Sequence, residues 1–247
     1  MDKSLAGKAA LVTGAGRGIG AGIARAFARH GAHVYCAGRT EEDLRTVADA
    51  IRTEGGQADA IATDIADPES VRALYERIGG RSEVLDILVA NAGFVPPGGA
   101  QAIDAATWRR VVEVNLFGSY DSIRLAVPLM RKRRGGKVIV VGSGAGRQPV
   151  PGMSSYCCSK AGLSMLVKVM AQELNEHGIS INELIPGPVI TERNRGQSGA
   201  AINNPALKSM EWVKEPDDVA PLALFLAAQP DEGGPTGQTF SLARRPL

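Results

Sequence analysis

The sequence has 247 residues, a net charge of +2 at pH 7, 44% apolar residues and only 4% aromatic residues. This length fits one large α/β domain or two small ones. The small net charge gives no electrostatic reason to expect nucleic acid or an acidic membrane surface as a partner. With so few aromatic side chains, the core must consist of Ala, Val, Leu and Ile, as in parallel sheets covered by helices.

Short apolar runs alternate with segments of helical periodicity along the chain. We expect strands at 8–14, 32–38, 57–63, 85–93, 136–143, 179–187 and 237–242. Helical patterns lie between them at 18–30, 41–53, 68–79, 104–132, 155–177 and 216–228. This alternation predicts a doubly wound (Rossmann), mostly parallel seven-stranded α/β sheet with helices on both faces. No linker or repeat interrupts it, so we expect residues 1–247 to form a single domain.

The longest irregular stretch is 187–215. Compact domains rarely contain structureless loops of this length unless the loop covers a ligand or is disordered. We therefore predict a substrate loop at 187–215.

The cysteines and histidines indicate a reduced protein without a metal site. Cys157 and Cys158 are adjacent, Cys36 is alone, and the three histidines are scattered, which gives no metal-ligand spacing. Such cysteine usage is typical of intracellular proteins, so we expect a cytoplasmic protein. We expect no signal peptide and no membrane span, because no apolar run approaches about 18 residues. The simplest interpretation of Cys157 and Cys158 is as small buried side chains, and a redox switch is the alternative.

A glycine-rich segment, VTGAGRGIG at 12–20, follows the first expected strand and opens the first helix. Glycines allow a tight turn and a close approach of the backbone, and a helix N-terminus attracts anions. A pyrophosphate fits all of these properties, and a merely tight turn is the alternative. The spacing is T-G-x-x-x-G-x-G through Gly14, Gly18 and Gly20. It differs from the common G-x-G-x-x-G fingerprint, because Ile19 occupies the position where that fingerprint has its third glycine.

The end of the second expected strand favours NADP(H) over NAD(H). NAD sites place an acid there to bind the ribose 2′-hydroxyl, whereas this strand ends in Gly38 and Arg39 and the first acid is Glu41. Arg39 can bind a 2′-phosphate through charge-assisted hydrogen bonds, and Arg17 can add a second contact. The alternative for Arg39 is a solvated surface side chain.

Tyr156 and Lys160 lie four residues apart at the start of an expected helix. Residues at this spacing share a helix face. Ser154 or Ser155 is expected to cap this helix, and Gly178 to end it. The pair alone does not distinguish a catalytic site from two surface side chains.

Several motifs occur in a fixed order: TGAGRGIG at 13–20, NAG at 91–93, Asn115, Ser143, Tyr156 with Lys160, and Pro186–Gly187 with Thr191. Together they resemble the short-chain dehydrogenase/reductase family in its compact single-domain branch. The resemblance covers the chain from about residue 5 to 238. Within that family the chain is similar to 3-oxoacyl-[acyl carrier protein] reductases and related ketone or alcohol oxidoreductases.

The resemblance implies a hydride transfer between NADP(H) and a ketone or secondary alcohol. Tyr156 would be the general acid or base, and Ser143 would hydrogen-bond the substrate oxygen. Lys160 would hold the nicotinamide ribose and lower the pKa of Tyr156. Asn115 would anchor a water. The cofactor-binding residues would be Gly14, Arg17, Gly18, Ile19, Gly20, Arg39, Asp64, Ile65, Asn91, Ala92, Gly93, Tyr156, Lys160, Pro186, Gly187, Val189 and Thr191. Among these, Asp64 would bind the adenine amino group, and Val189 and Thr191 the carboxamide.

The resemblance leaves alternatives open. These are a non-catalytic dinucleotide-binding sensor, an NAD-dependent alcohol dehydrogenase of the same family, and a sugar-nucleotide epimerase or dehydratase, which would need a larger C-terminal region. The substrate of a reductase could be an acyl-carrier thioester, a hydroxysteroid, a sugar or a polyketide. We expect a homo-oligomer, a homotetramer or a dimer, although the final segment SLARRPL departs from the family pattern where the tetramer interface commonly forms.

Overall fold

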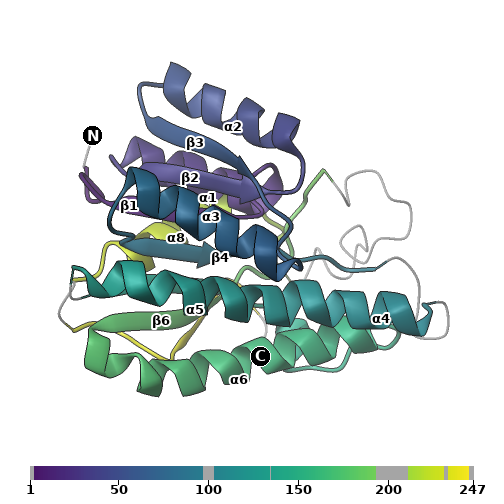
Figure 1. Cartoon of the computed structure of the whole chain (residues 1–247). Coiled ribbons are helices and arrows are strands. Elements are labelled where there is room, and N and C mark those ends of the chain that lie inside the picture. Colours follow the sequence, from purple (N-terminus) through teal and green to yellow (C-terminus); the bar gives the residue numbers. More distant parts are fainter. Residues whose placement is uncertain (1–2, 97–102, 134, 193–210, 231–232, 245–247) are drawn as a thin grey trace.

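The fold is a seven-stranded parallel sheet with helices on both faces, seen in a computed structural model that describes residues 3–96, 103–133, 135–192, 211–230 and 233–244 (Figure 1). The strand order is β3-β2-β1-β4-β5-β6-β7, and every neighbouring pair is parallel. The strands are β1 (Ala9–Thr13), β2 (His33–Gly38), β3 (Gln57–Ala62), β4 (Ile87–Ala90), β5 (Gly136–Val141), β6 (Ile179–Ile185) and β7 (Thr239–Ser241). The predicted fold class is confirmed.

The helices divide into two layers (Figure 1). One layer holds α1 (Gly18–Arg29), α2 (Glu41–Thr53) and α8 (Ala220–Ala227), which follows the 3-10 turn η5 (Pro216–Val219). The other holds α3 (Pro68–Arg81), α5 (Gly118–Arg131) and α6 (Ser154–Glu173), with the short α4 (Ala105–Val112) packed beside α6. Further turns are η1 (Glu113–Phe117), η2 (Gly144–Gly146) and η3 (Asn175–His177).

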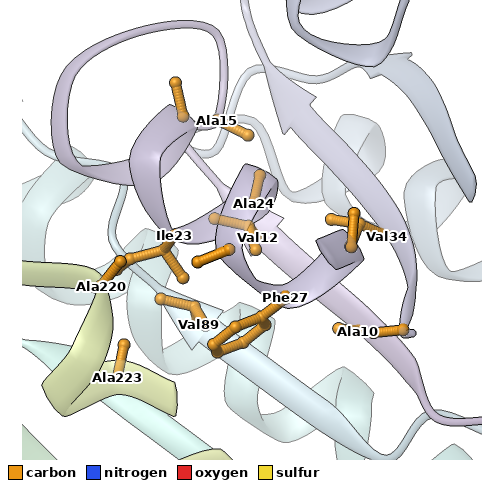
Figure 2. Close-up of a cluster of buried hydrophobic side chains, with 14 of the residues drawn as sticks. Ala10, Val12, Ala15, Ile23, Ala24, Phe27, Val34, Val89, Ala220 and Ala223 are labelled. Atoms are coloured by element: carbon orange, nitrogen blue, oxygen red, sulfur yellow. The ribbon is translucent and has the colours of Figure 1, made fainter. Parts of the chain in front are cut away.

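Each face of the sheet has its own apolar core, because successive residues of a strand point to opposite faces. Val12 of β1 packs in the α1 layer, whereas its neighbour Leu11 packs in the α3 layer. Figure 2 shows the first core, where Phe27 and Ile23 of α1 lie between the sheet and α8. Phe27 is fully buried. The five inner strands are thus covered on both sides, whereas the edge strands β3 and β7 are partly exposed.

The expected start of α6 was wrong. Neither Ser154 nor Ser155 caps the helix: it begins at Ser154, and Met153 occupies the N-cap position without a side-chain hydrogen bond. The Ser154 hydroxyl instead accepts a hydrogen bond from Trp108 Nε1, at 3.1 Å. The helix itself ends earlier than expected, at Glu173, and Gly178 instead ends the following 3-10 turn, η3, in the left-handed conformation with φ 69°.

Cys157 and Cys158 are not the small buried side chains that the sequence suggested. Cys158 is exposed and Cys157 is half-buried, whereas Cys36 is buried in β2. The buried face of α6 instead carries Ser155, Ser159, Leu163 and residues in helical register with them. Burial raises the pKa of the Cys36 thiol to about 12, so that side chain behaves as an apolar group.

Within the described ranges, no helix is long and apolar enough to cross a membrane. In the same part of the chain, no group of three or more His, Cys, Asp or Glu residues could hold a metal ion.

Phe27→Ala should lower the free energy of unfolding by about 3–5 kcal/mol, because it leaves a cavity between the sheet and α8. Urea denaturation followed by circular dichroism measures this loss. The matched variant Phe27→Leu keeps most of the side-chain volume and should lose much less. Equal losses in the two variants would contradict a tightly packed contact at this position.

Candidate active site

A cleft of about 1140 Å³ opens at the carboxyl ends of the strands. Its wall contains nearly all residues that the sequence singled out: Gly14, Arg17, Gly18, Ile19, Arg39, Asp64, Ile65, Asn91, Ala92, Gly93, Ser143, Tyr156, Lys160, Pro186, Gly187, Val189 and Thr191. Two predicted site residues, Gly20 and Asn115, do not line the cleft but support its wall. Residues 193–210 of the predicted substrate loop lie outside the described residues.

The glycine loop between β1 and α1 forms one wall of this cleft. Gly14 and Gly18 have positive φ angles of 67° and 56°, which L side chains rarely adopt. A Cβ atom on Gly20 would lie 2.3 Å from the Gly14 carbonyl oxygen and 2.6 Å from Asn91 Nδ2. The first turn of α1 contains no acidic residue, and its N-cap, Arg17, makes no capping hydrogen bond through its side chain. The loop therefore presents a helix N-terminus suited to an anion.

Thr13 and Asn91 join the glycine loop to the end of β4. The side-chain nitrogen of Asn91, Nδ2, donates to the backbone carbonyl oxygens of Thr13, at 2.9 Å, and Gly14, at 3.3 Å. In return, the backbone N–H groups of Asn91 and Ala92 donate to the Thr13 hydroxyl, each at 3.0 Å. Thr13 has no predicted role from the sequence. Its position directly before Gly14, at the end of a buried strand, is the signal that could have found it.

Asp64 and Arg39 lie at the end of the cleft beside β2 and β3. Asp64 accepts hydrogen bonds from the Arg110 guanidinium, at 2.8 Å, and from the Ala66 N–H, at 3.0 Å. Burial acts to raise the pKa of Asp64, but the Ala66 N–H, Arg110 and Arg39 together bring it below its usual value. Asp64 is therefore a carboxylate at neutral pH. Sequence reasoning missed Arg110, because nothing in the helical pattern of 104–132 marks it as facing a strand end.

Asn115 lies in a π-helical turn, η1, that connects α4 to α5. Its buried side chain accepts a hydrogen bond from the Phe94 N–H, at 2.8 Å, and donates to the Phe94 carbonyl and to the Ser159 hydroxyl, each at 3.1 Å. This side chain therefore holds the segment after β4 against α6. That it also anchors a water stays a prediction.

Tyr156 and Lys160 lie in the first two turns of α6, as the spacing predicted. Lys160 Nζ is 5.8 Å from the centre of the Tyr156 ring and donates to the Val141 carbonyl oxygen at 2.8 Å. Lys160 is buried, and desolvation lowers its pKa to about 8, although the nearby Glu183 carboxylate acts in the opposite direction. Lys160 therefore remains an ammonium at pH 7, close to the phenol.

Ser143 reaches the same cleft from the end of β5. It caps η2, and its hydroxyl accepts a hydrogen bond from the Ala145 N–H at 3.2 Å. Thus a hydroxyl, a phenol and an ammonium line one cleft with the glycine loop. This arrangement can bind a dinucleotide phosphate and exchange a proton with a ligand beside it.

The family model "short chain dehydrogenase" matches residues 8–200 of this chain. The chain belongs to the short-chain dehydrogenase/reductase family. That membership places it among oxidoreductases and agrees with the resemblance inferred from the motifs.

Known members of this family align with nearly the whole chain. The chain is 35% identical over 243 residues to a 7alpha-hydroxysteroid dehydrogenase of Escherichia coli, covering 97% of this chain and 94% of that protein. It is 31% identical over 251 residues to a 3-oxoacyl-[acyl-carrier-protein] reductase of Chlamydia muridarum, covering 98% of each. These two relatives act on different substrates, so family membership alone does not identify the substrate.

Solved structures of short-chain dehydrogenases share the fold. A Mycobacterium marinum short-chain dehydrogenase/reductase superimposes with a TM-score of 0.88 at 32% identity, covering 97% of this chain and 95% of that one. A Beutenbergia cavernae protein, crystallised with NADP at low occupancy, gives a TM-score of 0.88 at 31% identity, covering 98% of this chain and 97% of that one.

Gly20→Ala should weaken dinucleotide binding at least about tenfold, because its methyl group would displace either the Gly14 carbonyl or Asn91. Fluorescence titration with NADPH measures the affinity. Gly80→Ala is the matched control, since a Cβ at Gly80 of α3 meets no atom within 4 Å. Unchanged affinity in Gly20→Ala would refute the role of this contact.

Proposed function

We propose that the protein is an NADP(H)-dependent oxidoreductase that transfers a hydride between the nicotinamide and a ketone or secondary alcohol. The observation that carries this proposal is the presence of Ser143, Tyr156 and Lys160 in the same cleft as the glycine loop. A binding module that only senses dinucleotides would have no need for this combination of a phenol, a buried ammonium and a hydroxyl.

The residues of the cleft fit a dinucleotide along its whole length. The N-terminus of α1 and the glycine loop suit the pyrophosphate. Asp64 and Ile65 would bind the adenine, Asn91, Ala92 and Gly93 would border the cofactor, and Pro186, Gly187, Val189 and Thr191 would hold the nicotinamide end. A bound nicotinamide supplies or accepts the hydride.

Tyr156 moves the proton that accompanies the hydride. A free tyrosine ionises near pH 10, whereas a general acid or base works best with a pKa of roughly 7. The Lys160 ammonium stabilises the tyrosinate, because an opposite charge in a desolvated site favours the ionised form. Ser143 donates a hydrogen bond to the substrate oxygen, where negative charge develops during reduction.

The preference for NADP(H) rests on the charges near the end of β2. Arg39 and Arg17 both line the cleft, and both are exposed. Both can contact a 2′-phosphate. Of the three acids in the first turn of α2, Glu41 and Glu42 do not line the cleft, whereas Asp43 does and lies against Gly16 of the glycine loop.

The remaining wall of the cleft suits a substrate with an apolar flank. Phe94, Pro96, Val150 and Met153 line it, and the last two lie on the segment that leads into α6. An acyl chain would meet this requirement, so a 3-oxoacyl thioester is one candidate substrate. The segment 187–215 would cover the substrate.

We further propose a homo-oligomer, a tetramer or a dimer, located in the cytoplasm. Four large apolar side chains are exposed along η1, α5 and α6: Phe117, Tyr120, Met165 and Val169. Exposed apolar groups gathered on adjacent helices are typical of subunit contacts. The free state of all three cysteines supports a reducing compartment.

Tyr156→Phe should lower kcat for ketone reduction at least about a hundredfold, because the phenyl ring cannot give a proton. NADPH affinity should change little, since the ring remains in place. Steady-state kinetics with a ketone panel and a parallel NADPH titration measure both quantities. A variant with a near-wild-type rate would refute the acid role.

Arg39→Asp should weaken NADPH binding and lower the ratio of NADPH affinity to NADH affinity by about tenfold or more. The reason is that an acid repels a 2′-phosphate and accepts a hydrogen bond from a 2′-hydroxyl. Fluorescence titrations with NADPH and NADH, on wild type and variant, measure this. Arg45→Asp on the outer face of α2 is the control for net charge. A cofactor preference that stays the same in Arg39→Asp would mean that Arg39 is only a surface side chain.

A further inference from the structure

A buried acidic residue, Glu183, stands in the middle of β6, beneath the proposed active site. Its side chain is 1% exposed. One carboxylate oxygen, Oε2, accepts hydrogen bonds from Arg147 at 2.7 Å, from the Ser164 hydroxyl at 3.0 Å and from the Thr239 hydroxyl at 2.9 Å. A buried carboxylate is costly unless it is paired and hydrogen-bonded, so this arrangement needs an explanation that the apolar core does not provide.

Arg147 connects Glu183 to the segment that carries Ser143. It directly follows η2, the turn that Ser143 caps. Its guanidinium also donates to Ser164 of α6, at 3.1 Å, and to Thr239 of β7. One side chain thereby ties the loop after β5 to α6, β6 and β7.

The backbone on both sides of Ser143 is fitted closely against this ion pair and against α6. A Cβ on Gly142 would lie 2.1 Å from Glu183 Oε1, and a Cβ on Gly146 would lie 2.7 Å from the backbone carbon of Lys160. No side chain larger than hydrogen fits at either position without a shift. The loop that presents Ser143 is therefore clamped between Glu183 and the Lys160 turn of α6.

Glu183 also acts on Lys160 electrostatically. Lys160 Nζ donates to the Val141 carbonyl oxygen, and Glu183 Oε1 lies against the next residue, Gly142. Arg147 pairs with the other oxygen of this carboxylate, and Tyr156 is the titratable group on the preceding turn of α6. Desolvation lowers the pKa of Lys160, whereas Glu183 raises it. The carboxylate thus favours the charged form of the lysine on which the proposed chemistry depends.

We propose that Arg147 and Glu183 form a positioning unit that holds the Ser143 loop against α6 and supplies the negative charge that stabilises the Lys160 ammonium. This inference rests on the proposed function, because Ser143 and Lys160 are the groups that it serves. Arg147 and Glu183 themselves do not line the cleft.

The charge of Glu183 is tested with Glu183→Gln, which keeps the size of the side chain and an oxygen acceptor. In the unliganded wild type, Lys160 should lose its proton at about pH 8, and NMR titration of the lysine side chains measures this directly. Removing a nearby negative charge disfavours the ammonium, so the Lys160 titration should move to lower pH, by on the order of one unit. An unmoved Lys160 titration would overturn the electrostatic role.

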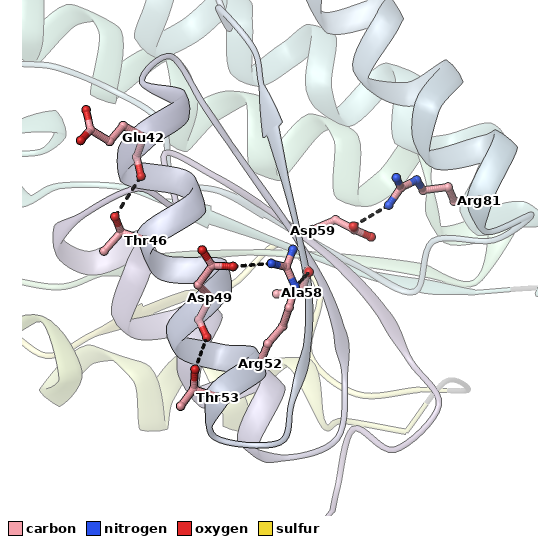
Figure 3. Close-up of polar contacts among 8 residues, drawn as sticks. All are labelled: Glu42, Thr46, Asp49, Arg52, Thr53, Ala58, Asp59 and Arg81. Carbon is pink, nitrogen blue, oxygen red and sulfur yellow. Dashed lines mark hydrogen bonds and ion pairs between the residues drawn. The ribbon is translucent and has the colours of Figure 1, made fainter.

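The clamp is tested without reference to activity by hydrogen–deuterium exchange on the unliganded protein. Arg147→Met should raise exchange in the segment 143–148 by at least about fivefold, because the loop opens locally more often, and Arg147→Lys should restore part of the protection. Arg81→Met is the matched control: Arg81 pairs with Asp59 of β3 (Figure 3), and neither residue lines the cleft. Exchange in 143–148 that is equal in Arg147→Met and the control would overturn the clamp.

The two experiments separate this inference from the proposed function. A wild-type protein that reduces no ketone, together with raised exchange in Arg147→Met, would support the clamp and refute the proposed function. A wild-type protein that reduces a ketone, together with unchanged exchange and an unmoved Lys160 titration, would support the function and overturn the inference. Should Glu183→Gln not fold, the exchange measurement on Arg147→Met against the Arg81→Met control still decides the clamp.

Discussion

The close approach of the glycine loop to the end of β4 is the contact on which the rest of the cleft depends. β1 has β2 on one side and β4 on the other, so the chain leaves the sheet in opposite directions at this point. Open parallel sheets bind ligands where their strand order reverses in this way. Thr13 and Asn91 hold the gap at a fixed width, and Gly20 allows the first turn of α1 to enter it. A dinucleotide can lie across the strand ends only because these backbones come so near to one another.

Buried polar residues around this contact hold the ends of the strands in place. Asn115 braces the segment after β4 from the side of α6, through Phe94 and Ser159. Lys160 reaches across to the end of β5 and donates to Val141. The buried amide, the ammonium and the Glu183 carboxylate therefore stiffen the strand ends from below, while the cleft above them stays open for ligands.

Much of this arrangement could be predicted from the sequence, because its signals are local. Strands buried on both faces read as apolar runs, and the helix face shared by Tyr156 and Lys160 follows from a spacing of four. Glu183 could not be recognised, since its partners Arg147, Ser164 and Thr239 come from three other segments and only the fold brings them together. The expected start of α6 was wrong because the Met153 carbonyl accepts the first helical hydrogen bond, from the Cys157 N–H, which puts Ser154 inside the helix. The exposure of Cys158 likewise depends on which face of α6 meets the sheet. Periodicity alone leaves that choice open for a helix that carries small residues on several sides.

The π turn at η1 has a consequence for how this chain tolerates insertions and deletions. The Gly118 N–H bonds to the carbonyl of Glu113, five residues earlier, so this turn contains one more residue than an α-helical turn. Each residue of an α-helix rotates the chain by about 100°. Deleting one residue between α4 and α5 would let the helix continue without interruption, and its hydrogen bonding would improve. The two halves would then be out of phase by about a quarter of a turn: with Ile123 and Met130 still facing the sheet, Asn115 would turn away from Phe94. The π turn thus sets the rotation of α5 relative to α4. Because of it, one long helical segment packs against the core at one end and places Asn115 at the site at the other.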